Sequence, residues 1–161
     1  MVQPLLFQSR KKKIKILSAI SFYPDLTHLS SQFTAIDLLV MKKILIIEDN
    51  SEIRENTSEL LELNNYQVLV AETGNTGFEL AKEHLPELIL CDMMMPGTDG
   101  EKFLKLAKED QYVQDIPIIF FSAGSILPAL QQTLINGANA YLQKPFTEEE
   151  LLKSVRKVLY A

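Results

Sequence analysis

Residues 88–100, LILCDMMMPGTDG, place an aspartate directly after a short apolar run. A run of this length, Leu88–Cys91, is typical of a strand that is buried on both faces of a sheet. A carboxylate at the end of such a strand costs free energy unless another group pairs with it. The stretch therefore predicts a buried strand and, for Asp92, a charged or polar partner elsewhere in the chain.

The same alternation of a short apolar strand and an amphipathic helix recurs from Met41 to Ala161. The predicted strands cover residues 44–48, 67–71, 88–91, 118–121 and 140–143. The predicted helices cover residues 51–63, 74–83, 99–108, 128–137 and 147–159. Apolar strands that alternate with helices predict a doubly wound α/β fold, with a parallel sheet covered by helices on both faces.

Length and composition agree with one globular domain. The chain has 161 residues, of which 47% are hydrophobic and 23% are charged. A single cysteine, Cys91, excludes an intramolecular disulfide framework and fits a reducing compartment, so we expect a cytoplasmic protein. No apolar run has the length of about 18 residues that predicts a membrane span, so no membrane association is expected.

The first forty residues lack the alternating pattern and differ in charge. They carry five basic and two acidic residues, a charge of +3, which leaves −8 for residues 41–161 out of the total of −5. We interpret 1–40 as an N-terminal extension, either flexible or a mis-assigned start ahead of MKKILIIEDN at Met41. The domain would then be 41–161, and its acidity argues against nucleic acid as a direct ligand.

Polar residues follow four of the five predicted strands. They are Glu48-Asp49 after the first strand, Asp92 after the third, Ser122 after the fourth and Gln143-Lys144 at the fifth. Parallel strands share one direction, so these side chains are expected to meet at one edge of the sheet. Crowded carboxylates repel one another unless a cation compensates, and carboxylate oxygens suit Mg²⁺. A lysine beside them suits a phosphoryl group, so the edge predicts a site for a metal ion and a phosphoryl group.

These motifs together resemble one family. Residues 42–161 resemble the receiver domain of bacterial two-component response regulators, of the single-domain kind that includes the chemotaxis regulators. The features that carry the resemblance are Glu48-Asp49, Asp92 with Met95-Pro96 and Asp99-Gly100, Ser122-Ala123, and Lys144-Pro145-Phe146. The resemblance implies a flavodoxin-like (βα)5 sandwich with a five-stranded parallel sheet of order 2-1-3-4-5.

The resemblance also implies a role for each matching residue. Asp92 would accept a phosphoryl group from a sensor histidine kinase or a histidine phosphotransfer protein. Asp49 and Asp92 would bind Mg²⁺, with Glu48 nearby and the backbone carbonyl of Met94 as a further ligand. Lys144 would bind a phosphoryl oxygen.

In the same way, the resemblance implies how the domain would signal. Ser122 and Tyr141 would move when the phosphoryl group is present, and would switch the face formed by the fourth helix, the fifth strand and the fifth helix. That face would bind an unknown downstream protein. We expect a signalling module with no output domain in the chain, not an enzyme, and a monomer or weak homodimer.

Two other functions remain open at this point. A haloacid-dehalogenase-like, Mg²⁺-dependent phosphatase also uses an aspartate at a strand end. That chemistry usually wants a second acid two residues later, where this chain has Met94, and a cap domain for which the chain is short. A pseudo-receiver would bind partners without phosphorylation, but the complete set of acids, serine and lysine argues against it.

Overall fold

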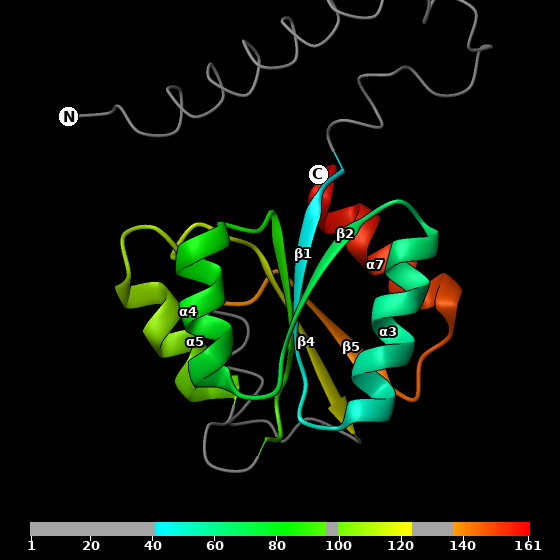
Figure 1. Cartoon of the computed structure of the whole chain (residues 1–161), viewed down its shortest axis with the longest axis horizontal. Coiled ribbons are helices and arrows are strands. Elements are labelled where there is room, and N and C mark those ends of the chain that lie inside the picture. Colours follow the sequence, from blue (N-terminus) through cyan, green and yellow to red (C-terminus); the bar gives the residue numbers. More distant parts are fainter. Residues whose placement is uncertain (1–40, 96–99, 124–136) are drawn as a thin grey trace, which may run out of the picture. The chain divides into compact units, whose positions relative to one another are not determined.

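The computed structural model describes residues 41–95, 100–123 and 137–161 (Figure 1). Its strands are β1 (Lys43–Ile47), β2 (Gln67–Ala71), β3 (Leu88–Asp92), β4 (Ile118–Ala123) and β5 (Ala140–Lys144). The helices in this part of the chain are α3 (Ser51–Leu63), α4 (Gly74–His84), α5 (Gly100–Glu109) and α7 (Glu148–Leu159). The helix expected at 128–137 and the extension 1–40 lie essentially outside the described residues, as do Pro96 and Asp99.

All five strands are parallel and form one sheet of order β2-β1-β3-β4-β5, which confirms the expected topology. β3 and β4 run further than their apolar runs predicted. Asp92 still pairs with Phe121 of β4, and Ser122 still pairs with Gln143 of β5. Ladder hydrogen bonds therefore continue past the last apolar residue. β1 ends at Ile47, one residue earlier than expected, so Glu48 lies just beyond the strand.

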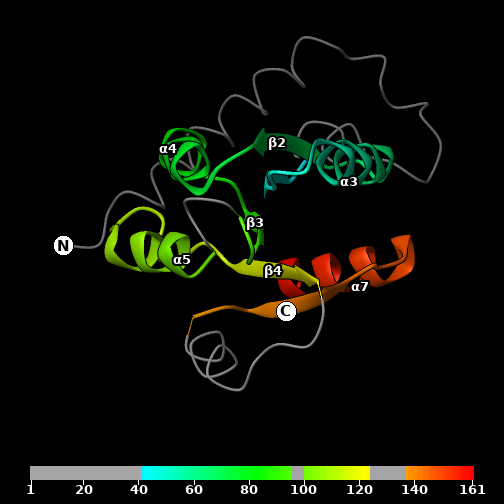
Figure 2. The ribbon, with the colours of Figure 1, turned by 90° about the horizontal axis from the view of Figure 1, so that it is seen from below.

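Helices cover both faces of the sheet, with α4 and α5 on one side and α3 and α7 on the other (Figure 2). Successive strand residues point to opposite faces, so each central strand supplies two apolar cores. Ile47, Cys91 and Phe120 belong to the core under α4 and α5. Ile46, Leu90 and Phe121 belong to the core under α3 and α7. The continuous apolar runs of the sequence are the consequence of this two-sided burial.

Polar groups at the helix ends fix where the helices begin and stop. Asn50 caps α3, Thr73 caps α4, and Thr147 with Glu150 forms the expected capping box of α7. The side chain of Lys43 donates to the carbonyl oxygen of His84, at 3.1 Å, where α4 ends. A cation there is favourable because the helix dipole places partial negative charge at that end.

No helix in the described part of the chain is both long enough and apolar enough to cross a membrane.

Candidate functional site

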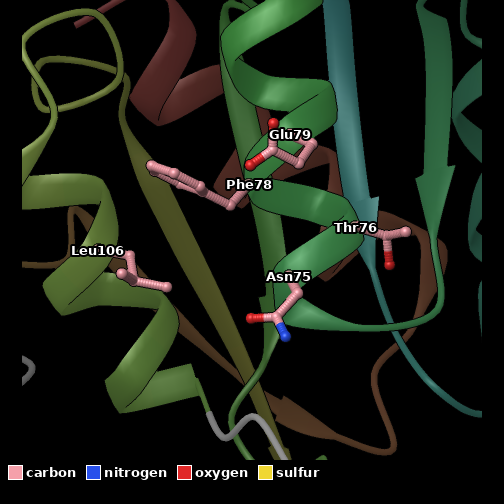
Figure 3. Close-up of a pocket in the computed structure, with 5 residues that line it drawn as sticks. All are labelled: Asn75, Thr76, Phe78, Glu79 and Leu106. Carbon is pink, nitrogen blue, oxygen red and sulfur yellow. The ribbon is translucent and has the colours of Figure 1, made fainter.

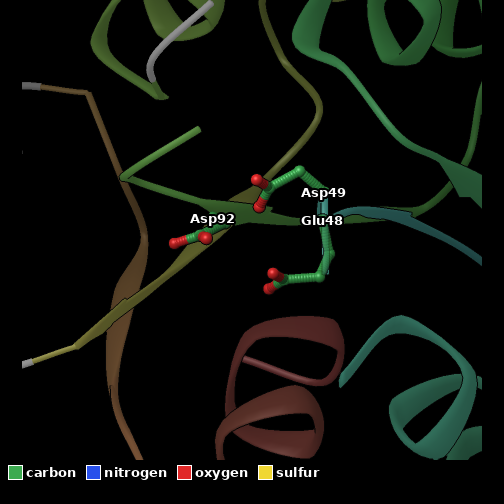
Figure 4. Close-up of side chains that lie close together, drawn as sticks. All are labelled: Glu48, Asp49 and Asp92. Carbon is green, nitrogen blue, oxygen red and sulfur yellow. The ribbon is translucent and has the colours of Figure 1, made fainter. Parts of the chain in front are cut away.

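Three carboxylates meet at the carboxyl ends of β1 and β3 (Figure 4). Glu48 and Asp49 come from the two residues after β1, and Asp92 is the last residue of β3. One oxygen from each lies within 4.8 Å of the others. Glu48 and Asp92 are buried and Asp49 is exposed, so the cluster has both a protein side and an open side. The sequence predicted this convergence.

Lys144 is the partner that the buried carboxylates require. Its Nζ lies 2.5 Å from Oε2 of Glu48 and 3.2 Å from Oδ2 of Asp92. The other oxygen of Asp92 accepts a hydrogen bond from the backbone N–H of Met94, at 3.2 Å. One ammonium therefore faces two buried acids, and Asp49 adds a third negative charge beside them.

Burial and the neighbouring charges shift the pKa of the Glu48 carboxyl. Burial raises the pKa of the Glu48 carboxyl, and the negative charge of Asp92 raises it further. The hydrogen bond from Lys144 acts in the opposite direction, but the net effect is a raised pKa. Burial is thus the main cause of the raised pKa, and the cluster places three carboxylates beside one ammonium.

The donor set of this cluster fits a hard divalent cation. Its ligand atoms are carboxylate oxygens at the end of two adjacent strands, and Asp49 is open to solvent on one side. Magnesium prefers oxygen ligands from one or two carboxylates together with water and phosphate oxygens. Among the described residues, the cluster combines these acids with no histidine or thiolate, so the chemistry does not favour a soft metal.

Gly100, the first residue of α5, lies close to the end of β3. Its backbone N–H donates to the carbonyl oxygen of Met93, at 3.0 Å. A Cβ on Gly100 would lie 2.8 Å from the ring of Phe120 and 2.9 Å from the carbonyl oxygen of Asp92. Only glycine lets α5 begin so close to the phosphoacceptor candidate.

The three methionines that follow Asp92 differ in their exposure to solvent. Met93 and Met95 are buried in the core under α4 and α5, whereas Met94 is 68% exposed. Their thioethers therefore serve packing or face solvent. The neighbouring Cys91 is fully buried, and burial raises the pKa of its thiol well above the usual value, so it is not a reactive thiolate.

Ser122 and Tyr141 lie on neighbouring strands β4 and β5. Ser122 is 6% exposed and directly follows Phe121, the register partner of Asp92. Tyr141 is half-buried and packs against the core under α4 and α5. The structure thus brings Ser122 to the edge that carries Asp92. The fourth helix of the expected switching face was predicted at 128–137, and residues 124–136 lie outside the described part of the chain.

The sequence analysis missed Arg54. This α3 residue is only 9% exposed, and its Nη1 donates to the carbonyl oxygens of Glu48, at 2.7 Å, and Asp49, at 3.3 Å. The signal was available, because helical spacing puts Arg54 beside Thr57 and Leu61 on the inner face of α3.

A shallow depression lies apart from this cluster, between α4 and α5 (Figure 3). It is lined by Asn75, Thr76, Phe78, Glu79 and Leu106. None of these residues belongs to the acid cluster, and the lining offers one carboxylate with no cation among its residues. The convergent charges make the edge with Asp92 the stronger candidate site.

Comparisons with known proteins identify the family of this chain. Residues 44–156 match the sequence model of the response regulator receiver domain. The phosphate regulon transcriptional regulatory protein PhoB of Klebsiella pneumoniae is 35% identical over 118 residues, which are 73% of this chain and 52% of PhoB. The chain thus spans about half the length of the curated relatives that it matches.

Solved structures show the same fold. The chemotaxis protein CheY4 of Vibrio cholerae is 30% identical with a TM-score of 0.71, over 74% of this chain and all of that one. The receiver domain of a sensor histidine kinase from Pseudomonas aeruginosa PAO1 has a magnesium ion coordinated in its active-site cleft. It is 24% identical with a TM-score of 0.70, over 76% of this chain and all of that one, and this likeness concerns the fold alone. By its sequence match and its fold, this chain belongs to the response regulator receiver domain family.

Proposed function

We propose that residues 42–161 act as a phosphorylation-switched receiver in which Asp92 accepts a phosphoryl group. The observation that carries the proposal is the pairing of buried Asp92 with Lys144 beside Glu48 and Asp49. The phosphodonor would be a phosphohistidine of a sensor histidine kinase or of a histidine phosphotransfer protein. Membership of the receiver family supports this donor class.

The chemistry follows from the side chains at the edge. An oxygen of Asp92 attacks the phosphorus of the phosphohistidine, an O–P bond forms while the N–P bond breaks, and the imidazole of the donor leaves. Lys144 donates to a phosphoryl oxygen and thereby neutralises charge that builds on the transferring phosphoryl group. Ser122 lies on the adjacent strand β4, and its hydroxyl would bind the phosphoryl group once it is attached.

The acid cluster would hold Mg²⁺ through Asp49 and Asp92, with Glu48 nearby and the carbonyl of Met94 as a further ligand. When bound, the ion supplies positive charge that neutralises the phosphoryl oxygens during transfer. Glu48, Asp49 and Asp92 lie together beside the single ammonium of Lys144, so carboxylates outnumber positive charges in this cluster. Added positive charge is therefore favourable at this edge.

Phosphorylation would bias a two-state face formed by the expected fourth helix, by β5 with Tyr141, and by α7. We propose that this face binds a downstream protein and that the domain works in the cytoplasm as a monomer or weak homodimer, without direct contact to nucleic acid. These finer statements rest on the receiver family and on the acidic charge of residues 41–161.

The test is phosphorylation by a small donor. The wild-type chain and Asp92→Asn are incubated with Mg²⁺ and acetyl phosphate, and the mass of the intact protein is measured. We expect a gain of one phosphoryl group on the wild type, no gain on the variant, and no gain on the wild type when Mg²⁺ is chelated before the donor is added. Equal labelling of both proteins, or none on the wild type, would contradict the proposal. Sustained hydrolysis of phosphomonoesters would instead favour a phosphatase.

A further inference from the structure

Arg54 is a buried arginine to which the proposed phosphoryl transfer assigns no role. Its side chain is 11% exposed, and a guanidinium is costly to bury unless its N–H groups are paired. Nη1 is shared between the carbonyl oxygens of Glu48 and Asp49, and Nη2 lies 3.1 Å from Oε1 of Glu72. Arg54 therefore binds the backbone of Glu48 and Asp49, two of the clustered acids.

Arg54 binds every carbonyl of the corner between β1 and α3. Its side chain takes those of Glu48 and Asp49, and its backbone N–H donates to that of Asn50, at 3.0 Å. Two N–H groups of the corner are paired as well, because that of Glu48 donates to the carbonyl oxygen of Ala71 and that of Asn50 donates to the Glu48 carboxylate. With these bonds made, the directions in which the Glu48 and Asp49 side chains leave the backbone are fixed.

We infer that Arg54 is a positioning residue that sets the affinity of the acid cluster for a divalent cation without being a ligand. The inference rests on the proposed binding of Mg²⁺ by this cluster. Outer partners that orient metal ligands commonly change metal affinity by about 10–100-fold when they are removed. Arg54 is suited to this role because one planar guanidinium reaches both carbonyls and Glu72 at once, which a lysine nitrogen cannot do.

The contact with Glu72 does not explain the burial of Arg54. The Glu72 side chain is 75% exposed, and ion pairs with such a solvated partner contribute little to folding. The two carbonyl contacts lie on the protein side, and the one to Glu48 is the shortest bond that Arg54 makes. The main role of Arg54 is therefore to bind the backbone carbonyls in the corner between β1 and α3.

The test compares Mg²⁺ affinity with stability. Isothermal titration calorimetry on the wild type, Arg54→Met and Arg54→Lys, well below each melting temperature, gives the dissociation constants. Arg54→Met is expected to weaken binding about 10-fold or more, and Arg54→Lys by less, since it keeps one donor. The matched control is Leu61→Val, buried on the same helix, which lowers stability but is expected to leave the affinity within about twofold of the wild type.

A second readout needs no metal. Amide hydrogen exchange in the presence of a chelator should speed up at Asn50 and Arg54 in Arg54→Met, but not in Leu61→Val. If Arg54→Met does not fold, Arg54→Lys decides by the same two measurements. Equal loss of affinity in the arginine variants and in Leu61→Val would overturn the inference, because a merely structural role predicts that result. Wild-type affinity in the arginine variants would overturn this inference alone, whereas a wild-type chain that binds no Mg²⁺ would overturn the proposed function as well.

Discussion

Asp92 is held in place both by its own strand and by groups from other parts of the chain. The apolar residues of β3 bury its backbone, Lys144 compensates its charge, and the N–H of Met94 holds one oxygen. Glu48 shares the same ammonium, so neither acid is fully compensated. Negative charge that is only partly compensated is expected to attract a cation to this edge of the sheet.

Gly100 is the residue where the site depends most directly on the size of a side chain. Replacing it by alanine should stabilise a helix by propensity, since glycine is about 1 kcal/mol less favourable. Here the added Cβ would lie 2.9 Å from both the carbonyl oxygen of Asp92 and Cα of Met93, which are backbone atoms. We expect Gly100→Ala to lower the free energy of unfolding by about 1–3 kcal/mol in urea denaturation.

Gly77→Ala is the matched control for this prediction. The three atoms nearest to a Cβ there all belong to the side chain of Ile47, which can shift more readily than the backbone atoms that a Cβ on Gly100 would meet. Its cost should be smaller than that of Gly100→Ala, and phosphorylation by acetyl phosphate should fall only in Gly100→Ala. A Gly100→Ala protein as stable as the wild type would show that the close approach of α5 is not required.

At the scale of an element, α7 shows how a helix start is fixed by four residues. The Thr147 hydroxyl accepts from the N–H of Glu150, at 3.3 Å, and the Glu150 carboxylate accepts from the N–H of Thr147, at 2.8 Å. Loss of an N-cap side chain typically costs about 1 kcal/mol. Thr147→Ala is therefore expected to lower the free energy of unfolding by about that amount, as measured in urea, while phosphorylation of Asp92 stays unchanged.

The same capping box makes a small part of the stability depend on pH. Hydrogen bonds from the backbone and hydroxyl of Thr147 lower the pKa of the Glu150 carboxyl below its usual 4.5. A lowered pKa in the folded state contributes stability that is complete above 4.5 and is lost as the pH falls through the lowered value. The melting temperature of the wild type should thus exceed that of Glu150→Gln at neutral pH. The difference between the two melting temperatures should shrink as the pH falls below 4.5. A difference that grows in acid would contradict the assignment.

Some elements could be predicted from the sequence and others could not, for physical reasons. The strand pattern and the capping box follow from local rules, namely two-sided burial and side-chain caps. The ends of β3 and β4 could not be predicted in this way, because pairing between strands extends past the apolar runs to include Asp92 and Ser122. Arg54 was not predicted because a charged residue ordinarily lies on the outside of a helix. Helical spacing indicates its inner position, but its partners, the carbonyls of Glu48 and Asp49, are brought to it only by the fold.

At the scale of the whole molecule, the site exists only when the sheet is formed. Glu48 and Asp49 follow β1, Asp92 ends β3 and Lys144 ends β5, so strands far apart in the sequence must pair in order before these charges meet. An unfolded chain does not hold this cluster, and a cation that binds it binds the folded state. Binding must then stabilise the fold by an amount that grows with the cation concentration.

This linkage gives a prediction for the intact chain. At a Mg²⁺ concentration of ten times the dissociation constant, the gain is about 1.4 kcal/mol, which corresponds to a rise in melting temperature of roughly 4–8 °C for a domain of this size. Differential scanning calorimetry at constant ionic strength, with Na⁺ replacing Mg²⁺ in the reference, measures the rise. Asp49→Asn removes one proposed ligand that is exposed, so it should fold normally yet lose most of the shift. An equal rise in both proteins would mean that the stabilising ion binds elsewhere, since loss of Asp49 can leave the shift unchanged only if the acid cluster is not the site.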